Sequence, residues 1–138
     1  MKKLAKVIAM MLVMILVLDC TATYASSKSI YYSGEYKNGK YVISLSEYTE
    51  KDSYKKGEIC GSMSLTYDGE PVMYGVEHFD IVFDGVSIKK AGKNKYTAKD
   101  PNTGSKCTIT VRKKSIKVKF SGKVAKNGSY KLKKRYYS

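Results

Sequence analysis

The feature of this sequence that most constrains its fold is a succession of short segments in which apolar and polar side chains alternate. The alternation begins at Ile30 and continues to the end of the chain. Alternation with a period of two places the apolar side chains on one face of a β-strand. The segments are separated by turn pairs such as Asn38-Gly39, Asp68-Gly69 and Asp84-Gly85. Asn-Gly favours two-residue hairpins because both turn positions take positive φ. Helical periodicity is absent beyond the N-terminal segment, so the sequence predicts an all-β domain.

These segments predict eight or nine strands at short, even spacing. The expected strands are Ile30–Lys37, Tyr41–Tyr48, Glu58–Tyr67, Val76–Phe83, Val86–Lys90, Lys95–Lys99, Ser105–Arg112, Ser115–Ser121 and Ser129–Tyr137. Connections this short favour pairing between strands that are neighbours in the chain. We therefore expect a small antiparallel up-and-down barrel, with a two-sheet β-sandwich as the alternative.

Residues 1–25 have the layout of a secretory signal peptide. Three lysines stand among the first six residues, an apolar run follows from Val7 to Leu18, and small side chains stand at Thr23 and Ala25. This order is typical of a cleaved export signal. The apolar run is shorter than the roughly 20 residues that a membrane-spanning helix needs. We predict cleavage after Ala25, with Ala22 as the alternative site. Residues 26–138 would then form one secreted or envelope-associated domain without a transmembrane helix.

The three cysteines suggest different chemistry. Cys20 follows the apolar run and raises the alternative of lipid attachment, but Asp19 stands where lipoprotein signals need a small residue. In an oxidising compartment, Cys60 and Cys107 are expected to form a disulfide. The predicted strand phase opposes this pairing, because it turns Cys107 inward and Cys60 outward. A bulge at Gly61 would reverse the phase of Cys60.

The charge of the chain is distributed unevenly. Residues 26–85 carry six lysines and ten acids, a net of −4. Residues 86–138 carry seventeen Lys or Arg and a single acid, Asp100, a net of +16. A block of one sign indicates an anionic partner.

Basic side chains recur in the outward phase of the last three predicted strands. The predicted binding face consists of Lys106, Arg112, Lys117, Lys119, Lys131, Lys133 and Arg135. Like charges on neighbouring strands destabilise a sheet, which favours a functional reason for keeping them. The alternative is that the lysines keep the sheet soluble and prevent edge pairing. We predict a non-enzymatic binding protein for an anionic cell-envelope polymer or an acidic protein. Nucleic acid is disfavoured, because tyrosine is frequent throughout the chain and marks no base-stacking site.

No catalytic or metal-binding motif is present. His78 is the only histidine and shares a strand face with Asp80, but one histidine cannot complete a set of nucleophile, base and orienting group. The neighbouring acids match no EF-hand spacing and are expected to lie in solvated turns; they are Asp68, Glu70, Glu77, Asp80 and Asp84. We therefore predict no enzymatic activity, no metal and no cofactor.

Gly34-Glu35-Tyr36 places an aromatic residue two positions after a glycine in the first strand. This pattern, together with the strand layout, resembles small secreted lipocalin-like barrels of the calycin type. That group usually has tryptophan at the position of Tyr36 and often packs an arginine of the last strand on it, whereas the predicted phase of Arg135 points outward. The resemblance implies a barrel and a ligand cavity.

A carrier of a small apolar ligand is therefore a second hypothesis. The expected lining is Met63, Leu65, Phe79, Ile81 and Phe120. The competing interpretation is an ordinary core, because small barrels are usually filled by their own side chains. A third hypothesis is inhibition of an extracellular hydrolase through the exposed loop Glu50–Gly57.

Overall fold

The computed structural model describes residues 30–48, 54–74 and 80–136, and all regular structure within these ranges is β-strand. The strands are β1 (Gly34–Asn38), β2 (Tyr41–Glu47), β3 (Ile59–Tyr67), β4 (Glu70–Pro71), β5 (Met73–Tyr74), β6 (Asp80–Ile81), β7 (Val86–Gly92), β8 (Lys95–Lys99), β9 (Lys106–Val111), β10 (Ser115–Phe120) and β11 (Gly128–Arg135). The predicted signal peptide and Cys20 lie outside the described residues.

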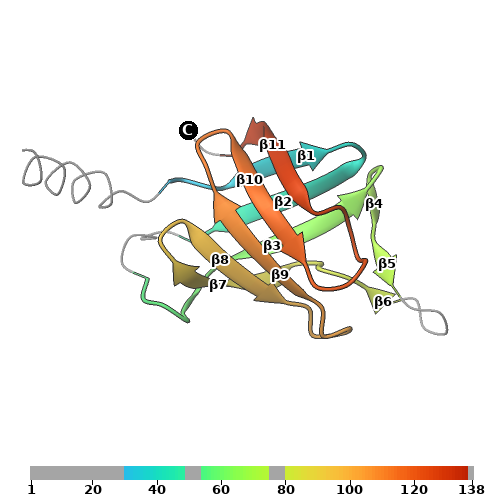
Figure 1. Ribbon diagram of the computed structural model, residues 1–138, viewed down its shortest axis with the longest axis horizontal. Coiled ribbons are helices and arrows are strands. Elements are labelled where there is room, and N and C mark those ends of the chain that lie inside the picture. Colours follow the sequence, from blue (N-terminus) through green and yellow to red (C-terminus); the bar gives the residue numbers. More distant parts are fainter. Residues whose placement is uncertain (1–29, 49–53, 75–79, 137–138) are drawn as a thin grey trace, which may run out of the picture.

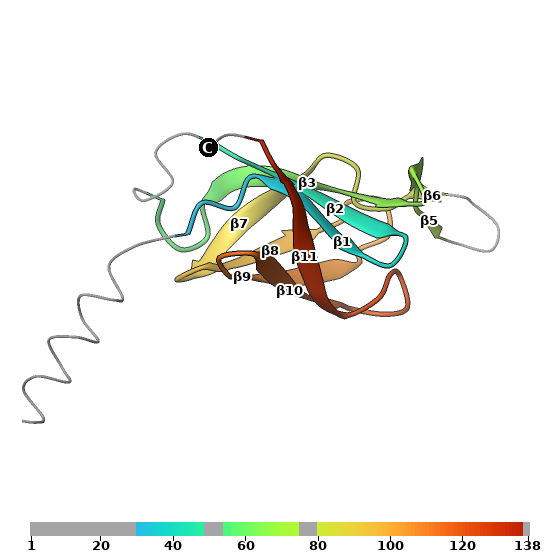
Figure 2. The same cartoon turned by 90° about the horizontal axis from the view of Figure 1, so that it is seen from above.

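Eight of these strands close into an antiparallel barrel. The sheet order runs β2-β1-β11-β10-β9-β8-β7-β3, and the additional β2–β3 pairing closes the ring. Apart from the passage through β4 to β6, each barrel strand pairs with its neighbours in the chain (Figures 1 and 2). The prediction of an up-and-down barrel is confirmed, and the sandwich alternative is wrong. Closure removes the free edges that an open sheet would expose.

The connection from β3 to β7 differs from the expected fourth strand, Val76–Phe83. Residues 75–79 lie outside the described ranges, and Asp80–Ile81 pairs with β5 in a separate two-stranded sheet. Both views place this small sheet beyond the body of the barrel (Figures 1 and 2). Phe83 has a φ of 52°, a left-handed conformation that ends a strand. Apolar alternation alone could not predict that the strand ends at Ile81 and pairs with β5 outside the barrel ring.

The barrel interior is filled by one contiguous apolar core. Tyr32, Tyr36, Tyr96 and Tyr130 are its largest fully buried side chains. The Tyr32 hydroxyl donates to the Cys60 carbonyl at 2.8 Å, and the Tyr36 hydroxyl donates to the Tyr32 carbonyl at 2.7 Å. An eight-stranded barrel is just wide enough for side chains of this size. Burial raises the pKa of the Tyr32, Tyr36 and Tyr130 hydroxyls above the ordinary value.

A β-bulge corrects the predicted orientation of Cys60. The β3–β7 register shifts between Ile59 and Gly61, which leaves Ile59 45% exposed and Cys60 only 1% exposed. Gly61 permits the bend, because a Cβ there would overlap the Ser46 carbonyl oxygen and crowd the Tyr32 hydroxyl. The outward phase expected for Cys60 is therefore wrong, and the bulge weighed for this position is present.

Both cysteines face inward but are free thiols. Cys60 lies on β3 and Cys107 on β9, with β7 and β8 between them. Three strand spacings separate the two backbones by roughly 14 Å along the sheet. A disulfide requires Cα atoms within about 7 Å. The expected Cys60–Cys107 disulfide is therefore not formed in this structure. Burial instead raises the pKa of the Cys60 thiol and raises that of Cys107 to about 12.

Candidate functional site

The outer face of β7 to β10 carries lysines and threonines in cross-strand register. Lys89 on β7 stands opposite Thr97 on β8, Thr97 stands opposite Thr108 on β9, and Thr108 stands opposite Lys119 on β10. An adjacent row joins β8 to β10; its members are Lys95, Thr110 and Lys117. Lys99 and Lys106 form a third row. We call these residues the lysine–threonine array: Lys89, Lys95, Lys99, Lys106, Lys117, Lys119, Thr97, Thr108 and Thr110.

The register of the array separates most of its charges. All six lysines are exposed, and only Lys99 and Lys106 stand directly opposite each other. The other lysines face threonine, and Lys117 also faces Ser129 on β11. Directly opposed like charges destabilise a sheet, so hydroxyl partners lower that cost. A dense positive surface is thereby compatible with a stable barrel.

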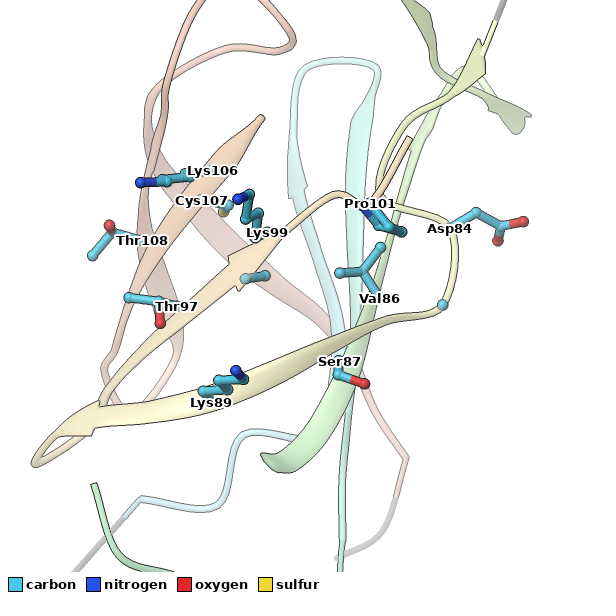
Figure 3. Close-up of a pocket in the computed structure, with 12 residues that line it drawn as sticks. Asp84, Val86, Ser87, Lys89, Thr97, Lys99, Pro101, Lys106, Cys107 and Thr108 are labelled. Carbon is cyan, nitrogen blue, oxygen red and sulfur yellow. The ribbon is translucent and has the colours of Figure 1, made fainter. Parts of the chain in front are cut away.

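An open groove of about 680 Å³ crosses one end of the array. It opens near the end of the β7–β8 ladder, which stops at Ile88 and Ala98. Its lining is Asp84, Gly85, Val86, Ser87, Lys89, Thr97, Ala98, Lys99, Pro101, Lys106, Cys107 and Thr108. Figure 3 shows Lys106 and Asp84 at opposite sides of the groove. Three lysines, three hydroxyl side chains and one acid therefore line a surface suited to an anion.

The single acid of the C-terminal half does not offset this charge at the surface. Asp100 is only 1% exposed. Its carboxylate accepts hydrogen bonds from the Phe83 backbone N–H at 3.2 Å and from the Thr103 N–H and hydroxyl at 2.8 and 2.7 Å. Residues 86–136, all of which the structure describes, thus present no exposed acid. The counter-charge of this surface must come from the N-terminal half, from solution or from a partner.

The structure brings together part of the predicted basic face. Lys106, Lys117 and Lys119 belong to the array. Lys131 is exposed on β11 opposite Ser115 and Lys37, and Lys133 is exposed two residues further along the same strand. These two lysines continue the basic surface beyond the array. Arg112 is exposed just after β9, where its N–H donates to the Ser115 carbonyl in the turn to β10.

Arg135 does not belong to the basic face. The β1–β11 register skips Lys133 between Leu132 and Lys134, which reverses the phase of the following residues. The Arg135 guanidinium donates to the Tyr31 carbonyl at 2.6 Å, to the Tyr36 hydroxyl at 3.3 Å and to the Lys113 carbonyl at 3.1 Å. The outward orientation expected for Arg135 is therefore wrong, because a bulge in β11 turns it toward the barrel end.

Three lysines of the array are missing from the predicted basic face, which contains only residues of the last three predicted strands. Lys89, Lys95 and Lys99 lie on β7 and β8. Their outward phase follows from the buried Ile88, Tyr96 and Ala98 between them. The sequence therefore predicts that these three lysines point outward. It does not show that β8 pairs with β9, which places them beside the lysines of the last three strands.

The other candidate residues do not form a second site in the described part of the chain. His78, Glu77 and Phe79 lie outside it, and so do residues 50–53 of the loop Glu50–Gly57. No group of three or more His, Cys, Asp or Glu side chains that could hold a metal occurs in the described ranges. Within those same ranges, no helix has the length and apolarity to cross a membrane.

The residues expected to line an apolar cavity have different environments. Met63, Leu65 and Phe120 are buried in the core, whereas Ile81 is half-buried on β6 outside the barrel ring. They therefore do not form one common lining.

Comparison of the chain with models of known protein families, with curated proteins and with solved structures gives no match. Function is therefore inferred from the geometry and charge of the surface.

Proposed function

We propose that this chain is a secreted, non-enzymatic binding protein whose basic outer sheet face engages an anionic envelope polymer or an acidic partner. One observation carries the proposal: exposed lysines occupy neighbouring strands from β7 to β11, while the only acid of residues 86–136 is buried. A surface serving solubility alone mixes charges of both signs, because a large field of one sign promotes non-specific association.

The tertiary pairing strengthens this reading of the charge. The lysines of β7 and β8 lie beside those of β9 and β10, so the basic surface is wider than three strands. A surface potential of one sign raises the local concentration of an oppositely charged partner. The hydroxyls between the lysines add hydrogen-bonding groups that a purely electrostatic surface lacks.

The test is co-sedimentation of the protein with isolated cell envelope at low and high salt. Binding at low salt that is lost at high salt is expected, because salt screens contacts between exposed charges. The variant Lys117→Glu/Lys119→Glu/Lys131→Glu/Lys133→Glu should lose this binding. A matched control, Lys113→Glu/Lys114→Glu/Lys123→Glu/Lys126→Glu, changes the net charge equally at exposed positions outside the array and β11. Equal binding by both variants would contradict the proposal, as would the absence of binding at low salt.

The lipocalin-like resemblance is supported by one contact. The Arg135 guanidinium of the last strand bonds to the Tyr36 hydroxyl of the first strand, which is the pair of positions that the resemblance links. This supports a related barrel architecture. It does not favour a carrier function, because Met63, Leu65 and Phe120 are packed in a contiguous core.

A further inference from the structure

We propose that the groove at the end of the β7–β8 ladder binds one single-chain amphiphile, with an apolar tail on the groove floor and an anionic head between lysines of the rim. The floor consists of Val86, Ala98 and Cys107, and the rim lysines are Lys89, Lys99 and Lys106. This inference rests on the proposed function, because the groove crosses one end of the same basic face. It deepens that function by requiring an apolar tail in addition to negative charge.

The groove exists because β7 and β8 separate within the barrel wall. Their ladder stops at Ile88 and Ala98, short of the start of β7 and of the end of β8. Continued in the same register, the ladder would place Gly85 opposite Pro101, which has no N–H to donate. Figure 3 shows β7 and the chain that follows β8 diverging toward Asp84 and Pro101. The wall of the barrel is therefore open at this point.

The divergence joins the outer surface to side chains of the inner face. Val86, Ala98 and Cys107 are buried and have the inward phase of their strands, yet they line the groove together with the outward Thr97 and Thr108. Ala98 stands directly opposite Cys107, and its small side chain leaves room above the core. Burial raises the pKa of the Cys107 thiol to about 12, so this thiol is uncharged at neutral pH. The floor is thus an uncharged, apolar strip that favours contact with hydrocarbon over water.

The rim concentrates positive charge on one side of the groove. Lys99 and Lys106 are the only lysines of the array that stand directly opposite each other, with Cβ atoms about 5 Å apart. Such a pair destabilises a sheet, and an anionic head between the two ammonium groups offsets that cost. Asp84 lies on the opposite side of the groove (Figure 3), so we expect the tail to run from the lysine pair toward β7. The methylene stems of the rim lysines extend the apolar surface along this path.

The two parts of the groove together select an amphiphile. A fully hydrophilic polyanion satisfies the rim but leaves the apolar floor uncovered, whereas a neutral hydrocarbon leaves the lysine pair without a counter-charge. The groove volume of about 680 Å³ is of the size that holds a single small ligand. The expected ligand is therefore one molecule with a single hydrocarbon chain and an anionic head.

The test is isothermal titration calorimetry with alkyl phosphates of increasing chain length, each below the concentration at which it forms micelles. Every methylene group that the groove covers should raise affinity about two- to fourfold, so dodecyl phosphate should bind at least about fifteenfold more tightly than octyl phosphate. Its binding should also show a negative heat-capacity change, the signature of apolar burial. Dodecyltrimethylammonium, which has the same tail and a positive head, should bind at least about tenfold more weakly. Inorganic phosphate should bind at least about a hundredfold more weakly.

Two variants separate the head from the tail. Lys99→Gln/Lys106→Gln should lower the affinity for dodecyl phosphate about tenfold and keep the dependence on chain length, because it alters only the head site. Its control, Lys113→Gln/Lys114→Gln, removes the same charge at exposed positions outside the groove and should retain most of the affinity.

Ala98→Val fills the floor and should reduce the dependence on chain length. Its control is Ala91→Val, a half-buried position of β7 outside the groove. A spin-labelled fatty acid locates the tail without any substitution: it should broaden the backbone amide signals of Ser87, Thr97 and Lys99 more than those of Lys113 and Lys114.

The outcomes distinguish this inference from the proposed function. Affinity that does not depend on chain length, or equal binding of the positively charged amphiphile, would overturn the inference, as would equal effects of a groove variant and its control. Binding to phosphatidylglycerol vesicles without binding to monomeric dodecyl phosphate would identify a membrane surface as the partner and would also overturn it. Salt-dependent binding to cell envelope would leave the proposed function standing in each of these cases, whereas its absence at low salt would refute that function.

Discussion

Replacing Asp100 with alanine tests whether a buried carboxylate organises the end of the groove. Asp100 directly follows β8. Its carboxylate accepts hydrogen bonds from the Phe83 N–H and from the N–H and hydroxyl of Thr103 in the next turn. Phe83 is fully buried, has a φ of 52° and packs its ring 5.6 Å from that of Phe120. The hydrogen bond that the Phe83 N–H donates to Asp100 therefore stabilises a strained segment just before the chain enters β7.

The magnitude follows from the three lost hydrogen bonds. A buried donor left without its acceptor costs about 1–3 kcal/mol, so the Phe83 N–H contributes about 2 kcal/mol. The Thr103 groups are half-buried and can be solvated, which reduces their joint contribution to about 1 kcal/mol. Asp100→Ala should therefore lower the free energy of unfolding by about 3 kcal/mol, a large part of the 5–15 kcal/mol typical of a domain.

Urea unfolding followed by tyrosine fluorescence measures this loss. With a slope of about 2 kcal/mol per molar urea, the midpoint should fall by about 1.5 M. Glu70→Ala is the control: it also removes one negative charge, but at an exposed position on β4, and should change stability by at most about 0.5 kcal/mol. A loss below about 1 kcal/mol for Asp100→Ala would refute the reasoning, since it would mean that water replaces all three bonds.

Three further predictions concern the core and the barrel closure. Burial places the pKa of the Cys107 thiol at about 12 against an ordinary 9.0, and raises the pKa values of Cys60 and the buried tyrosines. Above pH 9 the folded protein therefore retains protons that the unfolded chain releases. The free energy of unfolding should be at its full value below about pH 9 and should decrease as pH rises toward 12, by up to about 1.4 kcal/mol per pH unit for each such group. Urea midpoints that are constant from about pH 8 to 11 would contradict this prediction. Both thiols should react with Ellman's reagent only after unfolding, and reduction should leave the mass of the protein unchanged, whereas a gain of two hydrogens would reveal a disulfide. Arg135→Gln should lower the free energy of unfolding by about 2 kcal/mol through loss of the charged bonds to Tyr31 and Lys113, while Lys133→Gln, exposed on the same strand, should be nearly neutral; equal effects in thermal melts would show that these bonds contribute little.

Local patterns in the sequence predict most of the barrel strands. The ranges expected for β2, β3, β7, β8, β9, β10 and β11 agree with the structure to within a few residues. The inward phase of Cys107, Ile109 and Val111 is confirmed by their burial. These predictions succeed because alternation and turn chemistry are short-range properties, which each strand carries in its own residues.

The errors occur where the backbone departs from strict alternation. Bulges turn Cys60 and Arg135 from the expected outer face to the inner one, because one extra residue reverses the phase on one side of the bulge relative to the other. The expected fourth strand is observed only as β6, which ends at Ile81 and pairs with β5 outside the barrel ring; Phe83 then takes a left-handed φ and donates its N–H to Asp100, seventeen residues away. Neither a bulge nor a long-range hydrogen bond leaves a periodic signal.

Local patterns in the sequence were enough to predict an all-β class, pairing between strands that are neighbours in the chain, and an excess of positive charge after residue 85. The barrel pairing was needed to show that Lys89, Lys95 and Lys99 join the lysines of β9 and β10 and that threonines stand between them. It was also needed to show that Asp100, the one acid of this half, is buried. A strand's own residues set which face each side chain occupies, but the choice of neighbouring strand and the register across strands depend on closure of the whole barrel.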